Sequence, residues 1–165
     1  TITGDHLSLN GTLDVSDDLP GSMMITSNGV LSVNGNLLAN SSSQKGGSIE
    51  MNASSFQQMN ESIISANGTE GGSIYLSADN IMSSGTFSTT GSTTAGGHID
   101  IEGKNTIRLL SADILASGNE LGGLVRIGGA FQGGYDLTRT EEQEQTFLTR
   151  WGSIRDLENL SLIHI

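Results

Sequence analysis

The sequence predicts an all-β fold, a right-handed parallel β-helix with about 25 residues and three short strands per coil. Three observations lead to this prediction. A Gly-Gly motif recurs at nearly constant spacing, apolar and polar residues alternate after each motif, and the composition is rich in turn formers. Gly accounts for 23 of the 165 residues, whereas aromatic residues make up only 4%. Such a chain suits many turns and thin apolar layers better than a thick globular core.

The repeated motif is Gly-Gly-x-apolar-x-apolar. It begins at Gly46, Gly71, Gly96 and Gly122, at intervals of 25, 25 and 26 residues, and a degenerate copy begins at Pro20. Alternation with a period of two indicates a strand after each glycine pair. The pair itself indicates a corner, where a Cβ would obstruct a close approach or a positive φ is needed. A phosphate-binding loop is not expected, because neither Lys-Ser/Thr nor a helix follows the glycines.

The remainder of each repeat supplies two more short alternating runs, such as 105–109 and 112–116, bounded by turn residues. Successive coils then stack equivalent residues into columns about 4.8 Å apart. Two predicted inward columns form the structural core. The first contains Ile49, Ile74, Ile99 and Val125, and the second contains Met51, Leu76, Ile101 and Ile127.

Three outward columns are predicted from the same alternation. They contain Ser48, Ser73, His98 and Leu124; Glu50, Tyr75, Asp100 and Arg126; and Asn52, Ser77, Glu102 and Gly128. Because inward residues are apolar and outward residues are mostly polar, substitutions in the two sets should differ in effect. We expect Ile99→Asp to abolish folding and Asp100→Ser to change the melting temperature little.

The charge and the ends of the chain limit the partners. A net charge of −11 opposes binding to nucleic acid or to anionic lipid surfaces. No apolar run is long enough for a membrane span, so direct membrane insertion is not expected. The chain starts at Thr1 without a signal peptide, and we interpret it as an internal fragment. It contains no Cys, which excludes disulfides and thiolate metal sites but does not exclude export.

Two stretches carry a resemblance to a known family. Residues 71–81 and 114–134, which include the sequence GGLVRIGGAFQGG, resemble the β-helical exoproteins of bacterial two-partner (type V) secretion. These are the filamentous-haemagglutinin and high-molecular-weight adhesin type, and the resemblance extends over about residues 1–134. It implies export through an outer-membrane transporter partner and an extracellular, cell-surface location. It also implies attachment to a host-cell or bacterial-surface receptor or glycan, which the sequence does not identify.

The chain divides into three predicted parts. Residues 1–134 form the coils of the β-helix. Residues 135–158 lack strand alternation, and by analogy with the related exoproteins we interpret them as an extrahelical loop or a partly helical excursion. Residues 159–165 resemble a translated library adapter and are interpreted as a non-native tail.

One outward strand face carries three titratable residues at alternate positions, His98, Asp100 and Glu102. They could form a metal site or an acid–base pair. A solvated strand face is favoured, because the neighbouring coils offer no further ligands to converge on an ion. Asp100 and Arg126 are expected to form an exposed ion pair between coils, worth roughly 0–1 kcal/mol. No catalytic residue, metal ligand or cofactor is predicted.

Asn-x-Ser/Thr triplets mark possible glycosylation sites at Asn10, Asn40, Asn52, Asn60 and Asn67, with a further triplet at Asn159. Asn52 is predicted to point outward. The alternative is that the triplets follow by chance from a composition rich in Asn, Ser and Thr.

The function expected from this sequence is that of a structural and adhesive shaft segment in a large secreted surface fibre, without catalysis. One alternative is a polysaccharide-acting β-helix enzyme, which would need clustered carboxylates on adjacent coils. Another is the shaft of a contact-dependent toxin delivery protein, whose activity would lie in a separate carboxy-terminal domain.

Overall fold

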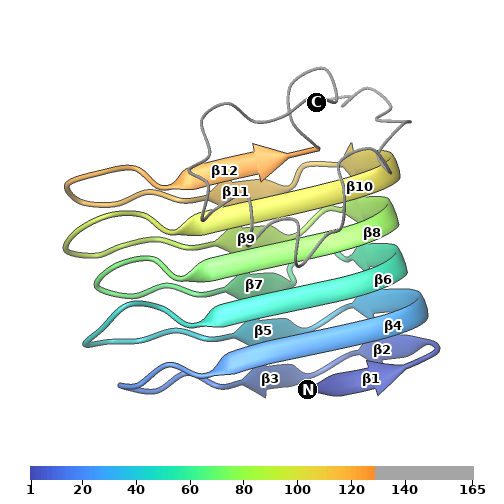
Figure 1. Cartoon of the computed structure of the whole chain (residues 1–165), viewed down its shortest axis with the longest axis horizontal. Helices are drawn as coiled ribbons and strands as arrows, with labels where there is room; N and C mark the ends of the chain where they lie inside the picture. Colours follow the sequence, from blue (N-terminus) through green and yellow to red (C-terminus); the bar gives the residue numbers. More distant parts are fainter. Residues whose placement is uncertain (129–165) are drawn as a thin grey trace, which may run out of the picture.

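The protein is a parallel β-solenoid of about five turns, with roughly 25 residues per turn (Figure 1). The structure is a computed structural model, and it describes residues 1–128. Strands are the only regular secondary structure in this range, and all of them pair in parallel. The predicted fold class is therefore confirmed. The expectations for residues 129–134, 135–158 and 159–165 lie outside the described residues.

The described strands form two sheets that run along the solenoid. The first sheet contains β1 (Ile2–Gly4), β2 (Leu7–Leu9), β4 (Ser22–Val33), β6 (Ser48–Gln58), β8 (Ser73–Ser83), β10 (His98–Leu109) and β12 (Leu124–Ile127). The second sheet contains β3 (Thr12–Asp14), β5 (Asn36–Leu38), β7 (Ile63–Ser65), β9 (Thr86–Ser88) and β11 (Asp113–Leu115). In Figure 1 the long strands stack at the front and curve round one side, and the short strands stack behind them.

The three apolar runs predicted for each coil are present, but the first two are joined in β4, β6, β8 and β10. Each long strand bends between its two runs. The pairing register shifts at this bend between Ser27 and Val30 of β4, and between Gly103 and Thr106 of β10. Such a local shift lets a strand bend sharply while its ladder of hydrogen bonds continues on either side.

The two predicted inward columns lie in the core of the first sheet. In β6, β8 and β10 their six side chains are at most 1% exposed, as expected. Burial of one such side chain stabilises the fold by roughly 1.5–3 kcal/mol. In the first column Ile49 aligns with Ile74, and Ile74 with Ile99. In the second column Met51 aligns with Leu76, and Leu76 with Ile101.

The last residue of each inward column departs from this pattern. Val125 pairs in register with Ile99 but is 40% exposed. Ile127 pairs with Ile101 and packs against the core, but it is only partly buried. Both belong to β12, which ends the described sheet, so no further described coil covers them. The prediction of a buried core residue is therefore wrong for Val125 and holds only in part for Ile127.

Apolar residues of the other two runs complete the core. Phe56 from the second run and Phe87 from the third are fully buried, and their ring centroids lie 6.4 Å apart. Phe56 stacks between Leu31 and Ile81 of the neighbouring coils. Each coil thus buries its side chains mainly against the coils above and below it. A single coil of about 25 residues could not offset its own ordering entropy, so the stability arises from stacking.

The Gly-Gly pairs mark corners at which successive coils approach closely. A Cβ on Gly72 would overlap the carbonyl oxygen of Gly47, and a Cβ on Gly97 would overlap that of Gly72. The same carbonyl groups accept hydrogen bonds from the next coil, with 2.9 Å from Ser73 N to Gly47 O and 2.9 Å from His98 N to Gly72 O. Gly128 is the only glycine within residues 1–128 that has a positive φ. The corner glycines are therefore required by close approach and not by left-handed backbone geometry.

We expect Gly72→Ala to lower the free energy of unfolding by about 1–3 kcal/mol, because the added methyl group would force two coils apart. Urea unfolding followed by circular dichroism measures this change. Gly11→Ala is the matched control, since a Cβ there would meet no atom within 4 Å. Equal losses of stability in the two variants would contradict the close-approach explanation.

Candidate functional site

The outward face of the first run carries the titratable residues that the sequence singles out. Register pairs align Glu50 with Tyr75, Tyr75 with Asp100, and Asp100 with Arg126, as predicted. His98 lies two residues before Asp100 on β10, and its ring centroid is 5.7 Å from that of Tyr75. The structure therefore brings these side chains together over adjacent coils.

Asp100 is the centre of this cluster. Its Oδ1 atom accepts a hydrogen bond of 2.7 Å from Arg126 Nε, and its Oδ2 atom accepts one of 3.1 Å from Arg126 Nη2. His98 Nε2 lies 2.9 Å from the same Oδ2 atom. The predicted ion pair between Asp100 and Arg126 is thus confirmed. It has the two-point geometry that makes arginine–carboxylate pairs strong and directional.

The expectation that this ion pair is exposed is wrong. Asp100 is only 7% exposed and Glu102 only 6%, although both alternate with the inward core residues of β10. The side chains of Arg126 and His98 lie directly against the Asp100 carboxylate. Burial raises the pKa of Asp100, but the hydrogen bond to His98 and the charge of Arg126 together lower it by more than burial raises it. The pKa of Asp100 is therefore below its ordinary value. Asp100→Ser is accordingly expected to destabilise the protein, contrary to the expectation from sequence.

The cluster is arranged for ion pairing more than for proton transfer. Both oxygens of Asp100 are engaged by Arg126 and His98, which favours the charged carboxylate over a carboxylic acid that donates a proton. Within residues 1–128, no group of three or more His, Cys, Asp or Glu side chains is placed to hold a metal ion.

Two of the predicted glycosylation triplets belong to a ladder of side chains at one corner. Ser16 Oγ accepts a hydrogen bond of 2.9 Å from Asn40 N, and Asn40 Oδ1 accepts one of 2.8 Å from Asn67 N. Asn67 Oδ1 in turn accepts bonds of 2.7 Å from Thr90 N and from Ser88 Oγ. Each side chain therefore caps a backbone amide of the following coil, which gives Asn40 and Asn67 a structural role.

The other three triplets lie at accessible positions. Asn10 is exposed and accepts a hydrogen bond of 2.7 Å from Asn34 Nδ2. Asn52 is partly exposed on the outward face of β6, as predicted, and Asn60 is exposed in the turn after that strand. Glycosylation at these five positions stays a prediction.

Sequence reasoning missed a buried polar residue in the core. Gln58 is 1% exposed, and its Nε2 atom donates hydrogen bonds of 3.2 Å to the carbonyl oxygens of Ser62 and Thr86. Its Oε1 atom accepts one of 2.7 Å from Ser83 Oγ on the next coil. The alternation that places Phe56 inward also places Gln58 inward, so the signal was present. The pattern assigns apolar residues to the core, so the polar residue Gln58 was not recognised as a core residue.

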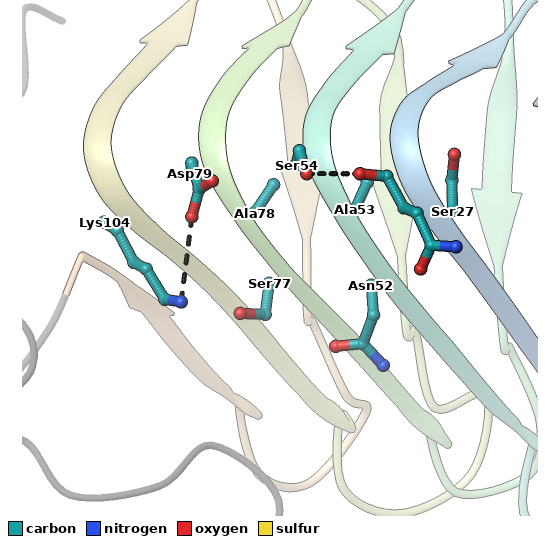
Figure 2. A pocket seen from close by; sticks show the side chains of 9 residues that line it. Ser27, Asn52, Ala53, Ser54, Ser77, Ala78, Asp79 and Lys104 are labelled. Carbon is teal, nitrogen blue, oxygen red and sulfur yellow. Dashed lines mark hydrogen bonds and ion pairs between the residues drawn. The ribbon is translucent and has the colours of Figure 1, made fainter. Parts of the chain in front are cut away.

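A shallow polar groove crosses the long strands at their bend. Its volume is about 320 Å³. Between its walls lie three aligned small residues of successive coils, Ser27, Ala53 and Ala78, of which Ser27 is 3% and Ala78 2% exposed. Figure 2 shows one wall formed by Asn52 and Ser77, and the opposite wall formed by Ser54 and Asp79, with Lys104 at one end. Because equivalent residues of successive coils align, the groove runs along the solenoid axis.

The walls of the groove are only partly engaged in hydrogen bonds. Ser54 Oγ donates a bond of 2.6 Å to the carbonyl oxygen of Asn28, and Lys104 Nζ lies 3.7 Å from Asp79 Oδ1. Asn52 Nδ2 donates a long bond of 3.4 Å to Glu50. Within the described part of the chain, the hydroxyl group of Ser77 has no hydrogen-bond partner, nor does the side-chain oxygen of Asn52.

Comparisons with known proteins do not extend these observations. No family model matches the chain, and no match was found among curated proteins or among solved structures. A search of residues 1–128 for helices long and apolar enough to cross a membrane found none.

We expect Asp100→Asn to lower the free energy of unfolding by roughly 2–4 kcal/mol near pH 7, because Arg126 would remain largely buried without its carboxylate partner. The pKa of Asp100 is lower in the folded state than in the unfolded state, so its contribution is complete above the unfolded pKa of about 3.9 and is lost as the pH falls through the folded pKa. Urea unfolding at several pH values should therefore show the difference from wild type shrinking below about pH 4.

The control for this experiment is Asp113→Asn, which alters an exposed carboxylate on β11. It is expected to change stability by less than about 0.5 kcal/mol. The assignment would be contradicted by similar effects of the two variants, or by a deficit in Asp100→Asn that grows in acid.

Proposed function

We propose that this chain is a structural and adhesive shaft segment of a large secreted bacterial surface fibre. The fibre attaches its cell to host cells or to neighbouring bacteria, and it reaches the cell surface through an outer-membrane transporter partner. The chain is extracellular in this proposal, and it catalyses no reaction.

The observation that carries this proposal is the repetition of one register from coil to coil. Ser48 aligns with Ser73 and Ser73 with His98, and the same alignment continues through the first run of these strands. A solenoid of this kind lengthens by adding coils, each of which contacts only its neighbours. Its outward columns form a long continuous surface, which suits a role in holding and presenting binding sites along a fibre.

The Asp100 cluster supports a shaft in preference to a polysaccharide-acting enzyme. Such an enzyme needs a carboxylic acid free to donate a proton and a second carboxylate placed across the scissile bond. The two carboxylate oxygens of Asp100 instead contact Arg126 and His98 at hydrogen-bond distance. The buried Arg–Asp pair joins β10 to β12, so it stabilises the alignment of two coils.

Surface display tests the proposal directly. We expect an epitope tag inserted between the exposed residues Ser42 and Ser43 of the parent protein to be labelled by antibody on intact cells. Deleting the gene of the transporter partner should abolish this labelling, and deleting the parent gene should reduce adhesion to host cells or to neighbouring bacteria. A tag placed beside the buried Ile74 is the matched control, since it should abolish display.

Labelling seen only after the cells are permeabilised would overturn the proposal. Loss of killing of neighbouring cells on deletion, with adhesion unchanged, would replace it with the toxin-delivery shaft.

A further inference from the structure

We propose that the axial groove at the bend of the long strands binds a neutral, extended, linear glycan. This inference rests on the proposed function, because it names the class of ligand that an adhesive shaft would bind. It concerns the groove that passes over Ala53 and Ala78 and is walled by Asn52, Ser77, Ser54 and Asp79 (Figure 2).

The shape of the groove favours a long, straight ligand. The groove takes lining residues from β4, β6, β8 and β10. Since neighbouring strands are about 4.8 Å apart, three steps between four coils give a length of about 14 Å. This is long enough for a short oligosaccharide lying along the axis. Between the walls no side chain larger than Ser or Ala stands in the way, because Ser27 and Ala78 are buried and Ala53 packs against the core.

The chemistry of the walls favours a ligand rich in hydroxyl groups. The hydroxyl group of Ser77 can donate and accept, and the side-chain oxygen of Asn52 can accept, without breaking a hydrogen bond within residues 1–128. Lys104 and Asp79 supply a further donor and acceptor at one end, and at 3.7 Å their ion pair is loose and exposed. A ligand that alternates donors and acceptors along its length would satisfy these groups together.

Two other classes of ligand fit less well. An acidic polymer would be repelled by the net charge of −11, and the one lysine of the groove is already paired with Asp79. An extended peptide that binds a sheet through its backbone adds a strand to an open sheet edge. The groove instead crosses β6 and β8, whose backbones pair with a strand on both sides. Its affinity must come from side chains, which favours a polyhydroxylated ligand.

A single groove this shallow is expected to bind weakly. It is open to solvent, and the ligand must displace water that already satisfies its polar walls. On a fibre that presents many copies of such grooves, simultaneous binding would raise the overall affinity greatly. Weak binding by one chain is therefore the expected result.

The test is a titration of the ¹⁵N-labelled chain with cellotetraose and with tetra-N-acetylchitotetraose, two neutral glycans with extended β-1,4 linkages. We expect at least one of them to shift the amide resonances of groove residues, including Asn52, Ser54 and Ser77. A heparin-derived tetrasaccharide should cause no comparable shifts. The proposal would be overturned if neither neutral glycan bound, if the shifts lay outside the groove, or if the acidic glycan bound equally well.

Variants on β8 locate the binding. Ser77→Ala should weaken binding about fivefold, the equivalent of one hydrogen bond, and Ser77→Trp should abolish it by filling the groove. Ser73→Ala is the matched control, since Ser73 is also partly buried on the outward face of β8 but lies four residues from the groove. Retention of binding in Ser77→Trp, or equal losses in Ser77→Ala and Ser73→Ala, would overturn the proposal.

These measurements use the isolated chain, whereas surface display uses intact cells. If the chain is displayed on cells but binds neither neutral glycan, the proposal for the groove fails and the proposal of a shaft stands. Failure of display, with the groove still binding, would instead refute the shaft.

Discussion

The close stacking of one coil on the next is the constraint on which the rest of the structure depends. Backbone carbonyl groups at the Gly-Gly corners accept hydrogen bonds from the coil above, and no Cβ fits between them. This approach holds equivalent residues of successive coils in register. Register then aligns the aliphatic side chains inside, and it aligns the polar side chains outside into walls and ladders. Loss of the close approach would remove the core and the groove together.

The pitch and the division into inside and outside could be predicted from the sequence, because the glycine pairs and the alternation recur nearly every 25 residues. The corner ladder could not. Its hydrogen bonds join residues 24, 27 and 23 positions apart, because the turns that precede the short strands β5, β7 and β9 differ in length, and no constant period aligns Ser16, Asn40, Asn67 and Thr90. The burial of Asp100 was also missed, because alternation tells which face a side chain occupies and not whether neighbouring side chains cover it.

Polar groups have two distinct uses in this solenoid. Gln58, Asn40 and Asn67 satisfy backbone groups of adjacent coils, where an unpaired amide or carbonyl group would cost stability. The walls of the groove keep part of their hydrogen-bonding capacity for other partners. Ala53 and Ala78, aligned residues of β6 and β8, line this groove and also pack in or against the core.

Cross-linking across one coil tests the central claim most directly, and the chain has no cysteine of its own to interfere. Ser48 and Ser73 are aligned partners on β6 and β8, so their Cα atoms are about 4.8 Å apart, within the range that a disulfide spans. The double variant Ser48→Cys/Ser73→Cys should form an intramolecular disulfide under mild oxidation. Ser48→Cys/Ser77→Cys, offset by four residues, should not, because its Cα atoms are about 14 Å apart. Equal yields from the two pairs would contradict coil-on-coil stacking in this register.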